Sequence, residues 1–213
     1  PFILQKRITL RWAAVSHCHP DQAKGMAEII AILAPEELWL SSAAAEDEYY
    51  NQLLVATPGK TKIMKIARSF MKKIDGCSVA CLSPPGFIEA GAAENNHSMV
   101  LRISDGRAAF LFCGDIEKDA EAELVAALGP GLGSPVLKVP HHGSRTSSSA
   151  LFLDALKPRL AVISVPAYSS YGFPHPDVVT RLKQRSIRWL STARSGGIMI
   201  ASSLDGLKID VSK

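Results

Sequence analysis

Short apolar runs and longer periodic segments alternate along this chain and predict its secondary structure. Apolar, β-compatible runs bounded by Gly, Pro or Ser are typical of strands; they lie at residues 12–16, 37–40, 79–83, 99–104, 108–113, 136–139, 159–165, 187–190, 197–202 and 207–211. Segments with helical spacing lie between several of these runs, at residues 23–33, 46–56, 116–128, 149–156 and 176–183. Strands interleaved with helices predict an α/β sandwich.

Two Asp-Gly pairs refine the predicted sheet. Asp105-Gly106 and Asp205-Gly206 each lie between two predicted strands, where such a pair indicates a β-hairpin turn. Part of the sheet is therefore expected to be antiparallel, and a purely parallel, doubly wound architecture is disfavoured. The mixture predicts sheets covered by helices.

Residues 60–74 stay open between two structures. Apolar side chains at positions 63, 66, 70 and 74 fit a helix, whereas the Asp75-Gly76 pair that follows suits strands joined by a turn. The same segment carries basic side chains at positions 60, 62, 65, 68, 72 and 73. They either track the backbone of a nucleic acid or form a solvated face.

Composition indicates one ordinary globular domain over residues 1–213. The chain is 47% hydrophobic and 21% charged, which excludes disordered and fibrous classes. A chain of this length buries roughly 70% of the surface that its unfolded form exposes, so it needs no disulfide or structural metal. The net charge of +4 favours anionic partners without proving one. The longest apolar stretches fall short of the roughly 20 residues of a membrane-spanning helix.

The four cysteines and the first residue add two expectations. Cysteines at 18, 77, 81 and 113 are too few and too scattered for a disulfide framework or a paired zinc knuckle, and we expect buried thiols. The chain starts with Pro1 and shows no charged segment followed by a cleavage signal. We therefore expect a piece excised from a longer protein.

The first group of candidate ligands follows the predicted strand at 12–16. Alternation in an extended segment places His17, His19 and Asp21 on one side, where two imidazoles and a carboxylate can converge on one cation or on two adjacent ones. The alternative is a pair of surface histidines in a turn.

Two further strand ends carry candidate chemistry. Asp115 follows the apolar strand at 108–113, and Gly114 leaves room for close approach, although a lone Asp there is also typical of a helix N-cap. His141 and His142 follow the strand at 136–139. The hydroxyl-rich segment at 143–149 after them is either an anion cradle ahead of a helix or an ordinary Ser-rich turn. Three such strand ends together indicate a metal site.

These motifs resemble a known superfamily and one family within it. The sequence HCHPDQ at 17–22 matches the His-x-His-x-Asp-His signature of the metallo-β-lactamase superfamily in all but its last position. The segments ENNHSMVL at 94–101, FLFCGDIE at 110–117, VLKVPHHGS at 136–144 and YGFPHP at 171–176 are similar to the C-terminal hydrolase domain of the ComEC family of DNA-uptake channel proteins. The resemblance covers about residues 5 to 205.

The resemblance implies an αββα sandwich with mixed sheets, lacking the family's first strands, and a two-metal site that hydrolyses phosphodiesters of DNA. Mn²⁺ or Zn²⁺ is the implied cofactor, with Asp115 bridging two cations and with the ligand set His17, His19, Asp21, Asp115 and His141. The implied catalytic residues are Asp21, His142 and Asn96, the latter two as outer contacts of metal or substrate. The segment after the paired histidines implies substrate contacts by Ser144, Arg145 and Thr146.

The family also implies a setting for the chain. The expected partners are single-stranded DNA and the rest of a parent transmembrane channel, with no small-molecule cofactor. The expected location is the extracytoplasmic side of a bacterial inner membrane, with this fragment itself soluble.

Two departures from the family keep alternatives open. Gln22 stands where the family has a histidine ligand, and an amide oxygen is a weaker donor, so the chain holds two cations, one or none. Phe173 stands where relatives read Gly-His-Pro, and His175 is either a substitute or a surface side chain. The alternatives to a DNA nuclease are another phosphoesterase of the superfamily and a catalytically impaired domain with a structural or DNA-guiding role.

Overall fold

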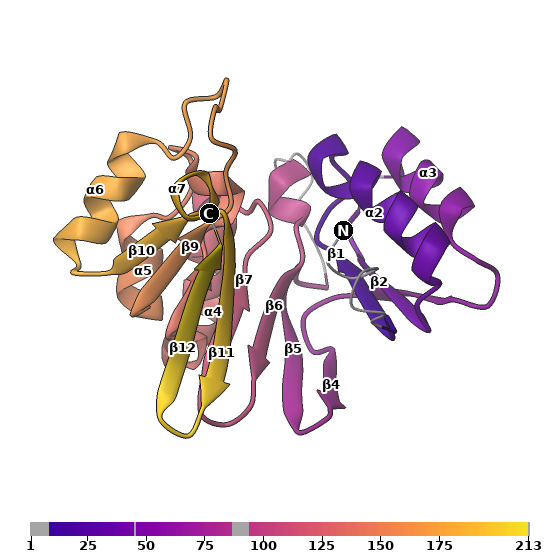
Figure 1. Ribbon diagram of the computed structural model, residues 1–213, viewed down its shortest axis with the longest axis horizontal. Helices are drawn as coiled ribbons and strands as arrows, with labels where there is room; N and C mark the ends of the chain where they lie inside the picture. The colour runs from indigo at the N-terminus through magenta and orange to yellow at the C-terminus, as the bar shows by residue number, and fades with distance from the viewer. Residues whose placement is uncertain (1–8, 45, 87–93, 213) are drawn as a thin grey trace.

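The computed structural model describes residues 9–44, 46–86 and 94–212, and a three-stranded parallel sheet comes first along the chain. Its strands lie in the order β1 (Trp12–Val15), β2 (Glu37–Ser41) and β3 (Lys62–Ile66). The helices α2 (Pro20–Leu33) and α3 (Glu48–Ala56) connect these strands and pack side by side over them (Figure 1).

A seven-stranded mixed sheet forms the second layer, in the order β10-β9-β8-β7-β6-β5-β4. Strands β4 to β7 pair antiparallel, while β7 to β10 pair parallel. The bounds are β4 (Met71–Ile74), β5 (Cys77–Ser83), β6 (Val100–Ser104), β7 (Ala109–Phe112), β8 (Val136–Lys138), β9 (Leu160–Ile163) and β10 (Arg188–Ser191). The hairpin predicted at Asp105-Gly106 joins β6 to β7, and the open segment at 60–74 contributes strands rather than a helix.

The remaining elements flank the larger sheet. Its helices are α4 (Lys118–Leu128), α5 (Ala150–Leu156), α6 (Pro176–Gln184) and the short α7 (Thr192–Ser195). In the described ranges, short 3₁₀ turns also connect elements: η1 (Glu94–His97), η2 (Gly129–Leu132) and η3 (Pro140–Gly143). A separate antiparallel hairpin of β11 (Gly197–Ser203) and β12 (Gly206–Ser212) lies in front of the larger sheet in Figure 1. It confirms the turn predicted at Asp205-Gly206.

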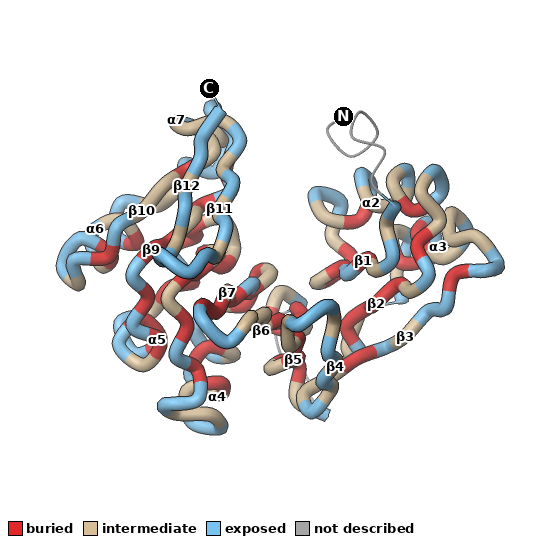
Figure 2. The backbone as a smooth tube through the Cα atoms, turned by 60° about the horizontal axis from the view of Figure 1, so that its bottom comes forward, coloured by how far each residue is buried: buried red, intermediate tan, exposed pale blue. Residues whose placement is uncertain are grey.

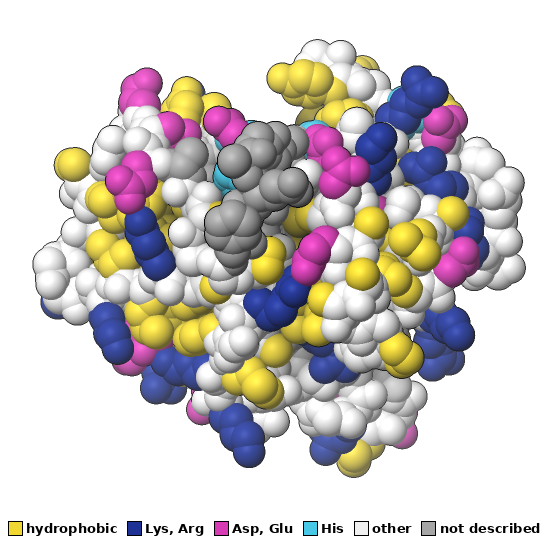
Figure 3. Space-filling model, turned by 180° about the vertical axis from the view of Figure 1, so that it is seen from behind, with side chains coloured by type: hydrophobic (Ala, Val, Ile, Leu, Met, Phe, Trp, Pro, Cys, Tyr) yellow, Lys and Arg dark blue, Asp and Glu magenta, His cyan; other side chains and the backbone are white. Residues whose placement is uncertain are grey.

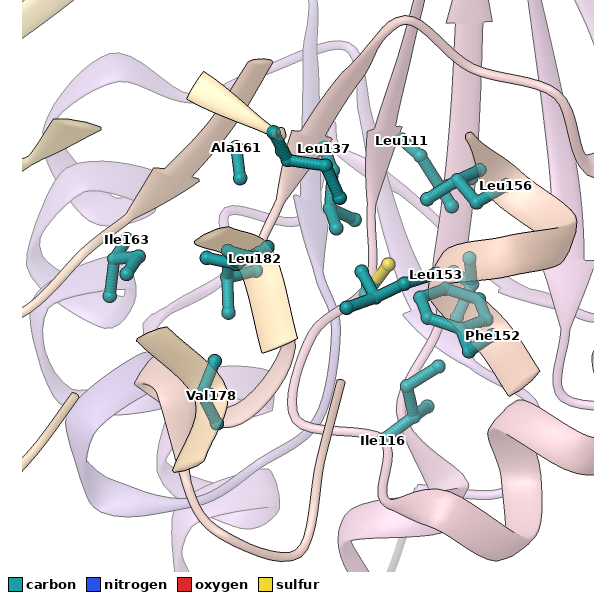
Figure 4. Packing of buried hydrophobic residues seen from close by; sticks show 14 of the residues in the cluster. Leu111, Ile116, Leu137, Phe152, Leu153, Leu156, Ala161, Ile163, Val178 and Leu182 are labelled. Atoms are coloured by element: carbon teal, nitrogen blue, oxygen red, sulfur yellow. The ribbon is translucent and has the colours of Figure 1, made fainter. Parts of the chain in front are cut away.

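Strand alternation distributes the apolar side chains over three cores. Leu38 and Leu40 of β2 pack against the helices α2 and α3, whereas Trp39 between them lies in the cluster that joins β2 and β3 to β5 and β6. On the other face of the larger sheet, α5 contributes Phe152 and Leu153 to the third core, shown in Figure 4. Figure 2 shows the buried residues following the strands and the inner helix faces. Because one cluster lies between the sheets and two lie under helices, the layers are αββα.

The mixed αββα architecture confirms the predicted fold class. Cys18, Cys81 and Cys113 are buried free thiols as expected, while Cys77 is half-buried. Among the helices in the described part of the chain, none has the length and apolar character needed to cross a bilayer. A backbone hydrogen bond from Met99 N to Ser16 O, 2.7 Å long, joins the end of β1 to the start of β6. This contact brings the carboxyl end of the first sheet to the edge where β7 and β8 end.

Candidate metal centre

His17 lies two residues beyond the end of β1 and is almost fully buried. Its Nδ1 is 3.0 Å from the Ser16 hydroxyl, and its Nε2 lies 3.6 Å from Asp115 Oδ2. Burial lowers the pKa of His17 to about 4, although the Asp115 charge opposes this shift. The imidazole is therefore neutral at physiological pH and has a lone pair available for a metal.

Asp21 lies near His17, as its spacing predicts, but it belongs to a helix and not to an extended segment. The chain is extended only as far as His19, which is the N-cap of α2; Pro20 and Asp21 form the first turn of that helix. Proline is favoured at a first helical position, and a carboxylate in the first turn is stabilised by the helix dipole. One ligand atom each of His17, His19 and Asp21 still lie within 4.8 Å of one another.

Asp115 is held in a tight turn between β7 and α4. Gly114 has a φ of +52°, and a Cβ at this position would lie 2.8 Å from Ser98 Cβ, so a larger residue does not fit. The Asp115 N–H donates to Ser98 Oγ at 3.0 Å, and the Glu117 N–H donates to Asn96 Oδ1 at 2.8 Å. The N-cap of α4 is Glu117, so the alternative interpretation of Asp115 as a helix cap is wrong. Asn96 acts here through the backbone that positions Asp115.

His142 joins the two carboxylates from the opposite side. Its Nδ1 lies 2.7 Å from the Ser164 carbonyl at the end of β9, which fixes the ring. Its Nε2 lies 3.2 Å from Asp21 Oδ2 and 3.5 Å from Asp115 Oδ2. A histidine whose second ring nitrogen donates to a carbonyl is the usual arrangement of a metal ligand.

His141 points elsewhere, although it is the neighbour of His142. Its Nδ1 is 3.4 Å from Glu117 Oε1, and its ring makes an edge contact with Phe173 at a centroid distance of 5.8 Å. Both histidines have positive φ, at 48° and 53°, in the turn after β8. The structure therefore brings His142 rather than His141 to the carboxylates, while both line the same cavity.

The charges in this cluster depend on one another. Hydrogen bonds to Asp115 and Asp21 raise the pKa of His142 to about 9, and the bond from His142 lowers the pKa of Asp21 well below its usual range. Burial alone would raise the pKa of Asp115, but the His142 bond and the Lys138 charge bring it below its usual value. In the absence of a cation, protonated His142 thus compensates two carboxylates.

The donor set fits divalent cations. Two groups of potential ligands share Asp21: His17, His19 and Asp21 form one, and Asp21, Asp115 and His142 form the other. In and beside these groups, His17 Nε2, Asp115 Oδ1 and His141 Nδ1 are buried and have no hydrogen-bond partner among the described residues. Buried polar atoms without partners are costly unless a ligand satisfies them. Imidazole and carboxylate donors suit Zn²⁺ or Mn²⁺.

Metal binding should depend on pH because a cation has to displace the proton on His142 Nε2. With a His142 pKa of about 9, we expect the affinity for Mn²⁺ to rise about tenfold per pH unit from pH 6 towards 9 and then to level off. Calorimetric titration in two buffers with different ionisation enthalpies should show release of about one proton at pH 7 for the cation that His142 holds. His142→Gln should bind more weakly and lose this slope; an unchanged slope would contradict the assignment.

The predicted anion cradle after His142 is filled by the protein itself. Glu121 of α4 is fully buried, and its carboxylate accepts from the N–H groups of Ser148 and Ser149, the latter at 2.8 Å. Burial raises the pKa of Glu121, while these hydrogen bonds oppose the shift. Arg181 donates to the carbonyl oxygens of Ser147 and Ser148 at 2.9 and 2.7 Å. These contacts make the segment a support for the His142 turn.

The predicted substrate residues lie beside this support and not among the residues that line the cavity. The buried Ser144 hydroxyl is 3.0 Å from the Thr146 hydroxyl. Arg145 is exposed, with Nε 3.4 Å from Asp177 Oδ2. His175 is the N-cap of α6 and accepts from the Asp177 N–H at 3.2 Å, as a surface side chain does.

Three of the six basic side chains in the segment at 60–73 are paired with carboxylates. Lys65 donates to Glu46, Lys72 to Glu37, and Arg68 makes a bidentate pair with Glu123. On the face drawn in Figure 3, Lys and Arg side chains are interspersed with acidic and apolar ones. This arrangement favours the interpretation of the segment as a solvated face.

A cavity of about 590 Å³ opens beside the ligand cluster. Asp21, Asp115 and His142 line one side, and the loop between β9 and α6 supplies the other with Tyr168, Tyr171 and other residues. Sequence reasoning did not select this loop for its aromatic side chains, nor Glu121 for its support of the His142 turn. The signal for Glu121 was its position three residues before Leu124 on the buried face of α4.

The architecture and the ligand cluster at the edge of the sheets define a protein with the metallo-β-lactamase fold. Two solved structures support this at the level of fold alone. The CmlA β-hydroxylase, a diiron enzyme from Streptomyces venezuelae, aligns with a TM-score of 0.54 and 10% identity over 87% of this chain and 44% of its own. The metallo-β-lactamase fold protein YhfI from Bacillus subtilis aligns with a TM-score of 0.50 and 10% identity over 85% of this chain and 74% of its own.

Curated relatives confirm the resemblance to the ComEC family of competence proteins. ComE operon protein 3 of Bacillus subtilis is 38% identical over 50% of this chain, and competence protein ComA of Neisseria gonorrhoeae is 39% identical over 54%. Recombination protein 2 of Haemophilus influenzae is 29% identical over 100% of this chain. The matches span 14%, 17% and 25% of those proteins' own lengths. No family model matches the chain.

Proposed function

We propose that this chain is a metal-dependent phosphodiesterase domain that hydrolyses DNA. The observation that carries the proposal is the convergence of His17, Asp115 and His142 from the ends of three strands, with Asp21 from the first turn of α2. Buried ligand atoms without a partner among the described residues support a cation at this place.

We assign the ligands from the distances. One cation would be held by His17 and His19, and the other by Asp21 and His142, with Asp115 between them. The assignment gives His142 the role that the family resemblance implies for His141, because His142 Nε2 is the nitrogen that faces both carboxylates. His141 then lies in the cavity wall beside Phe173.

The chemistry that such cations supply when bound is acidification of a water molecule and neutralisation of the charge that develops on a phosphoryl group. The residues of this chain orient the reacting groups. The side chain of Asp21 is 53% exposed and that of Asp115 only 4%, so Asp21 is the carboxylate that can accept a hydrogen bond from the attacking water. Asn96 keeps the Asp115 turn in place, and Ser164 fixes the His142 ring.

The curated relatives support a setting in DNA uptake. One of them is named as a competence protein, one as a ComE operon protein and one as a recombination protein, and the chain spans a quarter or less of the length of each. We therefore propose that the domain is one part of a membrane-associated DNA-uptake protein, that it acts on the extracytoplasmic side, and that its substrate is single-stranded DNA.

One observation favours a second candidate, an impaired domain that guides DNA without cutting it. Gln22 donates its amide to Asp21 Oδ2 at 3.2 Å and supplies no imidazole to the second cation. A site that lacks one strong donor binds its cation less tightly.

The substitution Gln22→His separates these two functions. If the amide is the only defect, we expect Mn²⁺ content to rise towards two equivalents and cleavage of single-stranded DNA to rise about tenfold or more. Elemental analysis and a gel assay with labelled DNA measure the two effects. Gln52→His on the exposed face of α3 is the matched control and should change neither. Increased metal content without any cleavage would exclude the nuclease and favour the guiding role.

A further inference from the structure

The loop between β9 and α6 exposes aromatic side chains beside the ligand cluster. Tyr168 is 97% exposed and Tyr171 is 80% exposed, and both line the cavity that Asp21, Asp115 and His142 line from the other side. The loop rises above the edge of the sheet in Figure 1. Tyrosine combines an apolar ring with a polar hydroxyl and is enriched at binding surfaces for that reason.

Both ends of this loop are fixed by hydrogen bonds, the first to α7 and the second to the turn that carries His142. At its start, Val165 N donates to Thr192 Oγ1 and Val165 O accepts from the same hydroxyl, each at 2.8 Å. At its end, the His175 N–H donates to Gly143 O at 2.8 Å. Pro174 packs so closely on Gly143 that a Cβ there would lie 2.8 Å from Pro174 Cβ. Since Gly143 follows His142 directly, the backbone at the end of the loop keeps a defined position relative to His142.

The rings form a series that leads out of the site. His141 makes an edge contact with Phe173, and Phe173 stacks on Tyr171 with a centroid distance of 5.6 Å and an interplanar angle of 22°. Phe173 thus packs against part of one face of the Tyr171 ring. The high exposure of Tyr171 leaves its other face open to a second flat ring.

We infer that Tyr168 and Tyr171 are a stacking platform for unpaired nucleobases next to the phosphate that the metal centre takes. This inference rests on the proposed function, because we place the phosphodiester at the side of the cavity that Asp21, Asp115 and His142 line. Aromatic side chains beside a phosphate site are the usual means of binding single strands without sequence preference. Bases inside a duplex are stacked on one another and cannot use such a platform.

A nucleobase suits this wall better than the acyl chain of a lipid phosphodiester. Ser169 and Ser170 line the same cavity as the two tyrosines, so its wall on this side is not purely apolar. The tyrosine hydroxyls add further polar edges, which a heteroaromatic base can hydrogen-bond and an acyl chain cannot. Short-chain phosphatidylcholine is therefore the competitor that tests the lipid alternative.

The test measures binding with Ca²⁺ as the cation, by fluorescence anisotropy of a labelled oligothymidylate and an abasic strand of equal length. We expect the wild-type protein to prefer the base-bearing strand about tenfold or more, and Tyr168→Ala and Tyr171→Ala each to lose about five- to tenfold of this affinity. The affinity of both variants for the abasic strand should stay unchanged, and Tyr171→Trp should keep the preference. Leu204→Ala, at an 86% exposed position in the β11–β12 turn, is the control and should have no effect.

Three results would overturn the inference: equal affinity of the wild-type protein for the two strands, unchanged affinity in both alanine variants, or displacement of the strand by phosphatidylcholine that depends on the two tyrosines. Cleavage with Mn²⁺ is measured separately. A protein that prefers bases but never cuts DNA would overturn the hydrolytic function and keep the platform. A protein that binds and cuts both strands equally would overturn the platform and keep the hydrolysis.

Discussion

Asp115→Asn should weaken the binding of Mn²⁺ by about 100-fold or more, because the substitution removes the charge that lies between both ligand groups. Asp115 is 3.6 Å from His17 Nε2 and 3.5 Å from His142 Nε2, and hardly any of its side chain is exposed. The variant also leaves Lys138, with Nζ 3.9 Å from Asp115 Oδ1, facing a neutral amide, so its uncompensated charge repels a cation. Calorimetric titration measures this loss.

The matched control is Asp119→Asn, the same change at an exposed position in the first turn of α4. It should leave the affinity for Mn²⁺ unchanged, and both variants should unfold cooperatively. An equal loss of Mn²⁺ affinity in the two variants would show that Asp115 acts only through the overall charge of the protein. That result would remove Asp115 from the ligand set.

Glu121→Ala should lower the free energy of unfolding by about 3 kcal/mol, because it leaves the N–H groups of Ser148 and Ser149 without an acceptor in a buried place. For a chain of this length, the melting temperature should fall by roughly 6–12 °C. Since Ser147 Oγ donates to Pro140 O at 2.9 Å, the damage should extend to the turn that carries His142. We therefore expect weaker Mn²⁺ binding as well as lower stability.

The comparison variant for stability is Asp119→Ala on the exposed face of the same helix, which should change the free energy of unfolding by no more than about 0.5 kcal/mol. Thermal unfolding of the metal-free protein measures both variants. A Glu121→Ala protein as stable as the wild type would mean that water replaces the carboxylate at these N–H groups. The segment would then not be the support of the metal centre that its hydrogen bonds indicate.

Most of the correct predictions come from two local features: apolar runs that form strands, and the polar residues that follow directly after them. The apolar run before Asp115 forms β7, and the run before the paired histidines forms β8, so both deliver their polar residues to one edge. Parallel neighbours place their carboxyl ends together, which is why position along the chain was enough to group Asp115 with the histidines. The family resemblance supplied the layers, because a motif set of this kind implies a fold that periodicity alone does not distinguish.

The sequence pattern did not predict the local structure at Asp21 or the partner of the Ser-rich segment. The spacing of His17, His19 and Asp21 indicated an extended segment, but helix α2 begins at Pro20. The signals of helix entry, a proline at the first position and an acidic first turn, were present and were outweighed by the alternation. The Ser-rich segment indicated an anion cradle for a substrate, but the anion is Glu121 from another helix. Nothing in the segment itself could name that partner.

The sequence by itself determined which strands end in candidate metal ligands, because apolar runs, turn residues and ligand types are all local properties. Only the tertiary structure decided which side chains face each other. His141 and His142 are adjacent and chemically identical, and both lie in left-handed backbone conformations after β8. His142 turns to Asp21 and Asp115 because the Ser164 carbonyl at the end of β9 holds its other nitrogen, while His141 packs against Phe173. That choice depends on strands and loops far apart in the chain, so no local pattern contains it.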